Sequence, residues 1–226
     1  MAATSAQAPT SVRLGVVAAL LSYAAGAGDA FAFVELGGVF TANMTGSLVL
    51  SGLTSRPGYG SLVSGAAVAL AAFLIAVYVA SRATPKRPQA QWSRIRAVLV
   101  AVVALDLLVL ILKSASSTPG TALRLVMLAV SAAAMGSQTA AAKRAVGGSG
   151  VTTTFVTGTM TSLAQDAADG STRHAVVRVG VVVMLFLGAL TASGAMAIDA
   201  RLGPAVAAVG TTVAILALPR ARGPAS

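Results

Sequence analysis

Residues 36–50 read LGGVFTANMTGSLVL, and residues 147–161 read GGSGVTTTFVTGTMT. Both strips contain a Gly pair, continue through Val to a Phe and include a Thr-Gly step. Each strip follows a long apolar run and leads into a short segment of mixed apolar and polar residues. This recurrence indicates that the chain consists of two related halves.

Each half has the same order of predicted parts: an apolar span, a Gly-rich break, a short helix and two further spans. A unit with three crossings reverses its orientation when it is repeated, and such inverted repeats are common in transporter folds. We therefore predict an all-α membrane protein with a single transmembrane domain over residues 1–226. Repeat 1 is expected over about residues 13–113 and repeat 2 over about 121–219, with polar tails at 1–12 and 220–226.

The composition excludes an ordinary water-soluble domain. Of the 226 residues, 56% are hydrophobic and only 10% are charged, whereas soluble domains carry about 25% charged residues. The net charge of +10 fits Lys and Arg in the cytoplasmic loops of a membrane protein better than a nucleic-acid-binding surface. The chain has no cysteine, which excludes disulfides and thiolate metal sites.

Six apolar stretches approach the length of about 20 residues that a spanning helix needs. They are Leu14–Val34, Leu62–Ala80, Ala97–Leu112, Leu125–Ala142, Ala175–Ile198 and Leu202–Leu218. The third stretch is short, and it can extend through Arg96 or Lys113 if these side chains snorkel. With the amino terminus inside, most of the 16 Lys and Arg residues fall on the inner side. The positive-inside rule then predicts a multi-pass protein of the bacterial cytoplasmic membrane with both termini in the cytoplasm.

The short segments at about Thr41–Leu53 and Thr153–Gln165 are too short and too polar to cross a bilayer alone. A half-helix that follows a Gly-rich break exposes unpaired N–H groups at its start, so it is a candidate binding element. Gly and Thr residues also allow close helix packing, which is the competing explanation. The candidate substrate-binding residues are Asp29, Asn43, Thr45, Gln138, Thr154 and Thr157. The glycines expected to permit the backbone breaks are Gly37, Gly38, Gly46, Gly147, Gly148 and Gly158.

Two acidic residues, Asp29 and Asp106, lie within apolar runs. A carboxylate at the centre of a membrane helix costs roughly 2.5–3.5 kcal/mol, so each needs a partner or a proton. Asp29 directly precedes the first strip, where it can meet a solute or a proton, or bind the broken backbone. Lys113 lies seven residues after Asp106 on the same predicted helix face, which makes an ion pair at least as good an interpretation as a proton relay.

The paired motifs resemble those of the YoaK-like family of bacterial membrane proteins of uncharacterised function. The first motif reads GAGDAFAF over residues 26–33 and GVFTANMTG over 38–46, and the second reads GSQTA over 136–140 and TTFVTGT over 153–159. Ser47 and Thr139 stand where this family often has Asn, which puts the ligand selectivity of this chain in doubt if those amides contact a ligand. The resemblance implies an integral membrane protein of about this size and supplies no substrate.

These features favour a small-solute membrane transporter or channel, optionally coupled to protons, with an unknown small polar solute as its partner. A non-transporting membrane scaffold or accessory subunit is the alternative. An enzyme is not expected, because the sequence has no His-Glu-x-x-His helix and no Lys-Ser or Lys-Thr pair after the Gly-rich strip at 147–150. We expect no catalytic residues, cofactor, metal or nucleic acid, and the small-residue helix faces are compatible with a homo-oligomer in the lipid bilayer.

Overall fold

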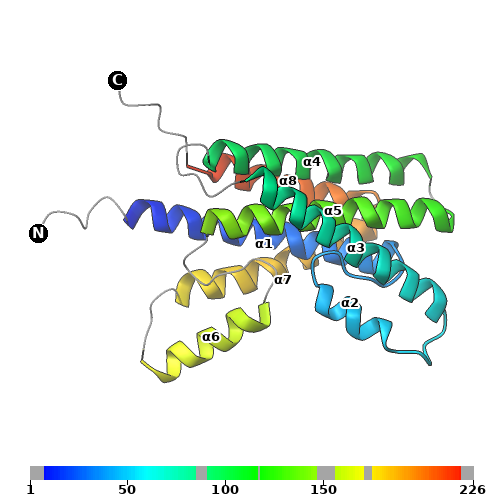
Figure 1. Ribbon diagram of the computed structural model, residues 1–226, viewed down its shortest axis with the longest axis horizontal. Helices are drawn as coiled ribbons and strands as arrows, with labels where there is room; N and C mark the ends of the chain where they lie inside the picture. Colours follow the sequence, from blue (N-terminus) through cyan, green and yellow to red (C-terminus); the bar gives the residue numbers. More distant parts are fainter. Residues whose placement is uncertain (1–7, 85–90, 117, 147–155, 171–174, 220–226) are drawn as a thin grey trace, which may run out of the picture.

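The computed structural model describes residues 8–84, 91–116, 118–146, 156–170 and 175–219. Within these ranges the secondary structure is helical, as the composition predicts. The elements are α1 (Ala8–Glu35), α2 (Met44–Ser51), α3 (Tyr59–Ala83), α4 (Gln91–Ala115), α5 (Thr121–Val146), α6 (Val156–Ala168), α7 (Ala175–Ile198) and α8 (Leu202–Ala217). The long helices run side by side in one bundle (Figure 1).

Five of the helices in the described ranges, α1, α3, α4, α5 and α7, are long and apolar enough to cross a membrane. They coincide with the first five predicted spans. The third, α4, begins at Gln91 and ends at Ala115, because charged residues at both ends extend the helix beyond its apolar run. The sixth, α8, has 16 residues and is about 24 Å long at 1.5 Å per residue, which is less than the roughly 30 Å of a bilayer core.

The two helices at the centre of the bundle are α1 and α5. In each, 61% of the most apolar window is buried, against 17–28% in α3, α4 and α7. The outer helices expose large apolar side chains; on α3, for example, Leu74, Ile75 and Val79 are all more than half exposed. An apolar outer surface around a small-residue centre suits a bundle surrounded by lipid.

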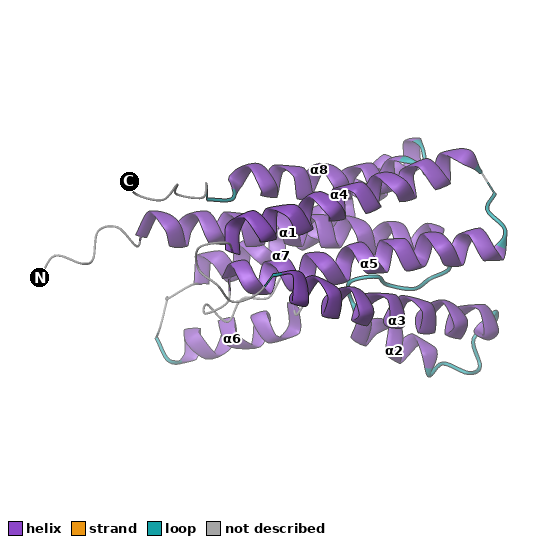
Figure 2. Cartoon of the chain, turned by 45° about the horizontal axis from the view of Figure 1, so that its top comes forward, coloured by secondary structure: helices purple, strands orange, loops and turns teal. Residues whose placement is uncertain are grey.

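The central helices have corresponding neighbours. Helix α1 packs against α7 and α8, and α5 packs against α3 and α4. The two central helices also touch each other, as do α4 and α8. Figure 2 shows these long helices in a second view, in which α1 and α5 again lie inside the bundle.

Glycines permit the closest helix crossings. A Cβ atom at Gly26 of α1 would overlap the carbonyl oxygen of Leu185 of α7, and one at Gly188 of α7 would overlap that of Tyr23. On the other side of the centre, a Cβ at Gly136 of α5 would overlap the carbonyl oxygen of Phe73 of α3. Backbone contact of this kind replaces the hydrophobic drive that is absent in lipid.

The short helices α2 and α6 lie on the same flank of the bundle, one towards each end (Figure 1). Helix α2 packs along α3, and α6 packs along α7. Each begins near the middle of the bundle and runs outward (Figure 1). The two short helices therefore start at mid-depth and point away from each other.

Candidate functional site

The backbone break after α1 is held by the carboxylate of Asp29. Its Oδ1 accepts hydrogen bonds from the amides of Thr41 at 2.7 Å and Ala42 at 2.6 Å, and its Oδ2 accepts one from the amide of Asn43 at 3.0 Å. The Thr41 hydroxyl lies 3.4 Å from Oδ1 as a further donor. Three successive amides therefore converge on one carboxylate, an arrangement otherwise used to bind a free anion.

A glycine pair makes this geometry possible. Gly37 and Gly38 have φ values of 105° and 77°, which residues other than Gly rarely adopt. The two residues turn the chain back after Glu35, so that residues 41–43 run alongside the last turns of α1. Gly46 and Gly158, which we expected to permit breaks, lie instead inside α2 and α6, where the backbone stays helical.

A serine closes the same turn from the other side. The Ser47 hydroxyl donates to the carbonyl of Phe40 at 3.1 Å and accepts from the Phe40 amide at 3.0 Å. The Phe40 ring stacks on Phe33 of α1, with ring centroids 4.9 Å apart. The amides of residues 40–43 are thus all bound by protein side chains, as suits non-helical backbone at membrane depth.

Asn43 and Thr45 stand at the start of α2. Asn43 is the N-cap, and its Oδ1 accepts from the Gly46 amide at 3.1 Å and from the Thr45 hydroxyl at 3.0 Å. Both side chains belong to exposed residues. The structure therefore brings three predicted site residues, Asp29, Asn43 and Thr45, into one group.

Gln138 forms a second buried polar group at the centre of the bundle. Its Nε2 donates to the Leu21 carbonyl of α1 at 2.9 Å, and its Oε1 accepts from the Thr211 hydroxyl of α8 at 3.2 Å. Gln138 and Thr211 are both 0% exposed. This amide ties α5 to α1 and α8, and its hydrogen bonds go to these helices rather than to Asn43 or Thr45.

The remaining predicted residues lie apart from the Asp29 group. Thr157 is exposed on α6, and α6 does not contact α2. Thr154, Gly147 and Gly148 lie outside the described residues. The sequence did not single out the Ala42 amide or the Glu35–Lys113 ion pair, because each is a contact that only the tertiary fold creates.

The partner of Lys113 differs from Asp106, the partner that the sequence favoured. Lys113 Nζ lies 2.7 Å from Glu35 Oε2, with side-chain exposures of 6% and 22%. The ion pair of Lys113 is therefore with α1 and not with Asp106. Asp106 is 3% exposed, and its Oδ2 has no hydrogen-bond partner among the described residues.

The model of a family described as "Protein of unknown function (DUF1275)" matches residues 17–218. The chain belongs to the DUF1275 family. It is also 32% identical over 148 residues to the "UPF0700 transmembrane protein YoaK" of Bacillus subtilis (strain 168). That alignment covers 65% of this chain and 64% of the relative, so less than two thirds of the relative's length.

Membership of the DUF1275 family confirms the resemblance that the paired motifs indicated. With its transmembrane relative and its apolar helices, this DUF1275 protein is a multi-pass membrane protein. No solved structure matches the chain.

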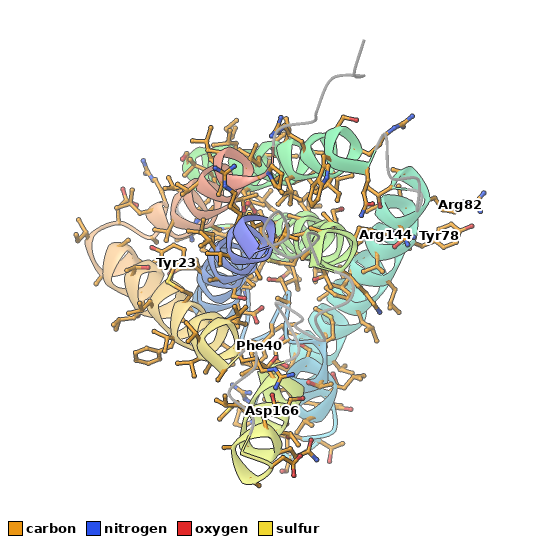
Figure 3. All side chains as sticks on the ribbon, turned by 90° about the vertical axis from the view of Figure 1, so that its left-hand side faces the viewer. Tyr23, Phe40, Tyr78, Arg82, Arg144 and Asp166 are labelled. Atoms are coloured by element: carbon orange, nitrogen blue, oxygen red, sulfur yellow. The ribbon has the colours of Figure 1, made fainter. Side chains whose placement is uncertain are left out.

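Polar contacts also join the helices of this DUF1275 protein at their crossings. The Tyr23 hydroxyl lies 2.7 Å from the Thr191 hydroxyl where α1 crosses α7, and Figure 3 shows Tyr23 between these helices. Arg178 of α7 pairs with Asp166 of α6 and also donates to the Ser162 carbonyl. Asp166, which lies towards the tip of α6 in Figure 3, therefore fastens the second short helix to its long neighbour.

A groove of about 210 Å³ lies between α2 and α3. Its wall is almost entirely apolar, apart from the two serine residues of α2. It is lined by Met44, Ser47, Leu48, Ser51, Val63, Ala66, Ala67 and Leu70. A groove of this character suits hydrocarbon better than a polar solute, so the polar groups around Asp29 are the better candidate for solute contact.

Proposed function

We propose that this DUF1275 protein is a transporter or channel for a compact polar solute in the bacterial cytoplasmic membrane, built from two inverted three-span repeats. The observation that carries the proposal is the placement of α2 and α6, which start at mid-depth and run to opposite ends of the bundle (Figure 1). Half-helices with this placement form the substrate sites of several secondary transporters. The proposal assigns the protein no catalytic activity.

The packing of the helices supports the inverted repeat. Exchanging α1–α4 for α5–α8 in chain order turns the α1–α7 and α1–α8 contacts into the α5–α3 and α5–α4 contacts, all of which occur. The α2–α3 contact likewise becomes the α6–α7 contact. Gly26 and Gly136 each provide the close approach of a central helix to its outer partner. In Figure 1, α1 and α5 run in opposite directions.

The backbone amides at the break after α1 already have a partner, which limits the class of solute that can bind there. The amides of residues 41–43 already bind the Asp29 carboxylate, so at this end they are not free to bind an anion. Asn43 and Thr45 present the exposed polar side chains beside the break. This arrangement favours a neutral or cationic solute with hydrogen-bonding groups.

The charge distribution supports cytoplasmic termini. Arg82 lies in the last turn of α3, and Lys143 and Arg144 lie in the last turn of α5. Helix α5 ends at the same end of the bundle at which α1 begins and α8 ends (Figure 1). Basic residues accumulate on the cytoplasmic side of membrane proteins. The opposite end, with Lys113 neutralised by Glu35, would then face outward.

The test is a flux measurement with purified full-length protein in liposomes. Small cations, small anions, weak acids and neutral polar solutes are screened with a dye that reports internal pH. For the solute that moves, Thr45→Val should lower flux several-fold and leave the unfolding midpoint unchanged, because the exposed Thr45 hydroxyl bonds only to Asn43. Thr212→Val is the matched control, since that hydroxyl bonds only its own helix at Ala208.

A non-transporting scaffold or accessory subunit is the second candidate. It is favoured by one observation: Asp29, Ser47 and Gln138 all find their partners within the chain, as residues that only lock helices together would. Absence of flux for every solute in the screen would favour this function and contradict transport.

A further inference from the structure

Asp106 is a buried acid to which neither the helix packing nor the proposed solute site gives a role. It lies on the inner face of α4 in a row of buried residues at helical spacing, and the row consists of Ile95, Leu99, Val102, Asp106, Val109 and Lys113. Asp106 is 3% exposed, and its Oδ2 accepts no hydrogen bond from the described residues. A buried carboxyl oxygen without a donor is rare in proteins and calls for a physical explanation.

The other acids near the spans all have partners. Asp29 binds three amides, Glu35 pairs with Lys113, and Asp166 pairs with Arg178. Lys113, two helical turns from Asp106 on the same face, is therefore already neutralised. Among the described residues, Asp106 forms no salt bridge, and its Oδ2 is buried without a hydrogen-bond partner.

The elements packed against α4 bring no charge to the depth of Asp106. Helix α8 has no charged residue between Leu202 and Ala217, and the charges of α3 and α5 lie near the helix ends, at Arg82, Arg124, Lys143 and Arg144. The charged residues of α1 in this half of the bundle are Asp29 and Glu35, both of which are acids. These elements therefore supply no cation that would stabilise an ionised Asp106.

Asp106 lies at the depth of the Asp29 turn. One turn before it, Val102 belongs to the buried cluster that also contains Ala25 and Ala42, and the Ala42 amide binds Asp29. One turn after it, Val109 packs in the cluster that contains Phe31. Because Ala25 and Phe31 bracket Asp29 on α1, the two acids occupy the same level of the bundle, one satisfied and the other not.

An ionised carboxylate without a partner in a medium of low dielectric constant is far less stable than the neutral acid. We propose that Asp106 is an intramembrane proton-binding site. A proton from water forms an O–H bond with the Asp106 carboxylate to give the neutral acid, and release returns that proton to water when the face of α4 is hydrated. If the proposed transport function holds, Asp106 rather than Asp29 is the group that carries a coupled proton.

Infrared difference spectroscopy on the full chain in liposomes tests the proton site without knowledge of the solute. The spectrum of the wild type minus Asp106→Asn should contain the C=O stretching band of a protonated carboxylic acid at neutral pH, and this band should give way to carboxylate bands as the pH is raised. The Asn variant should stay folded, because its amide resembles the neutral acid in size. If it does not, Asp106→Glu retains the acid and shifts the band.

A matched difference spectrum serves as the control. Asp29→Asn should remove carboxylate bands at neutral pH, since three backbone amides donate to the Asp29 carboxylate. Carboxylate bands in the Asp106 difference spectrum at neutral pH would overturn the proton site.

The flux assay separates this inference from the proposed function. If a solute moves with protons, Asp106→Asn should abolish the internal pH change that accompanies its movement. A protonated Asp106 in a protein that moves no solute would leave the proton site standing and reject transport. Flux with an unchanged pH signal in Asp106→Asn would reject the coupling role.

Discussion

The two central helices carry their polar residues in different ways. In α1, Gly26 makes the helix crossing, and Asp29 follows three residues later and binds a broken backbone. In α5, Gly136 makes the corresponding crossing, and Gln138 and Thr139 follow. Thr139 bonds only its own helix, at the Met135 carbonyl 2.8 Å away, and Gln138 joins neighbouring helices.

Asp29 makes its contacts through a charged group and Gln138 through a neutral one. We call the bonds of Asp29 to the amides of residues 41–43 the charged lock, and the bonds of Gln138 to Leu21 and Thr211 the neutral lock. A carboxylate that accepts three amides fixes the path of the chain into α2, because each bond is charge-assisted and directional. The Gln138 amide instead holds whole helices at one spacing without fixing any turn. Among the described residues, the polar contacts of Asp29 thus define a turn, and those of Gln138 define a contact between helices.

The largest expected effect comes from breaking the charged lock. Asp29→Asn removes the charge and leaves at least one of the three amides without an acceptor, so it should lower the free energy of unfolding by roughly 2–4 kcal/mol. Thermal unfolding in detergent, followed by the fluorescence of the single Trp92, gives the measurement. Thr139→Val is the matched change in α5 and should cost less than about 1 kcal/mol. Equal effects of the two substitutions would contradict the comparison.

A smaller effect is expected from the neutral lock. Gln138→Leu keeps the volume but removes the hydrogen bonds to Leu21 and Thr211, and it should destabilise the protein by about 1–2 kcal/mol. Replacing both partners with apolar groups, as in Gln138→Leu with Thr211→Val, should recover part of the loss, since no buried hydroxyl then lacks a partner. A double variant that is less stable than the sum of the single variants would disagree with this account.

An effect smaller than those at Asp29 and Gln138 is expected at Ser47, beside the backbone break after α1. Ser47→Ala removes both hydrogen bonds to Phe40 but leaves the Asp29 contacts in place, so the loss should be about 1 kcal/mol. Hydrogen exchange should rise at the Phe40 amide and stay unchanged at the Thr41 and Ala42 amides. Faster exchange at all three amides would mean that Ser47, and not Asp29, holds the turn.

The sequence predicted the class of the protein and its helices better than the partners of its polar residues. The apolar runs gave each long helix, because length and hydropathy alone decide whether a segment can span a bilayer. The apolar runs underestimated the length of α4, since the charged residues at its ends lie outside the run.

The partners were harder to predict because they depend on tertiary contacts. The spacing of Asp106 and Lys113 on one face favoured an ion pair, but Glu35 is 78 residues away in sequence and lies closer in the fold. From the sequence, Asp29 could contact either a solute or the backbone. The Gly37–Gly38 turn decides between the two, because it brings the amides of residues 41–43 to Asp29. The direction of that turn cannot be read from the spacing of residues along one helix.

The short helix α8 has a consequence for the surrounding bilayer. Its 16 residues are about 6 Å shorter than a hydrocarbon core of about 30 Å. Because Arg201 at its start is half-exposed, we expect phosphate headgroups and water to reach inward to it and the leaflet to thin beside α8. This hydrophobic mismatch is expected to favour a thinner hydrocarbon core beside α8.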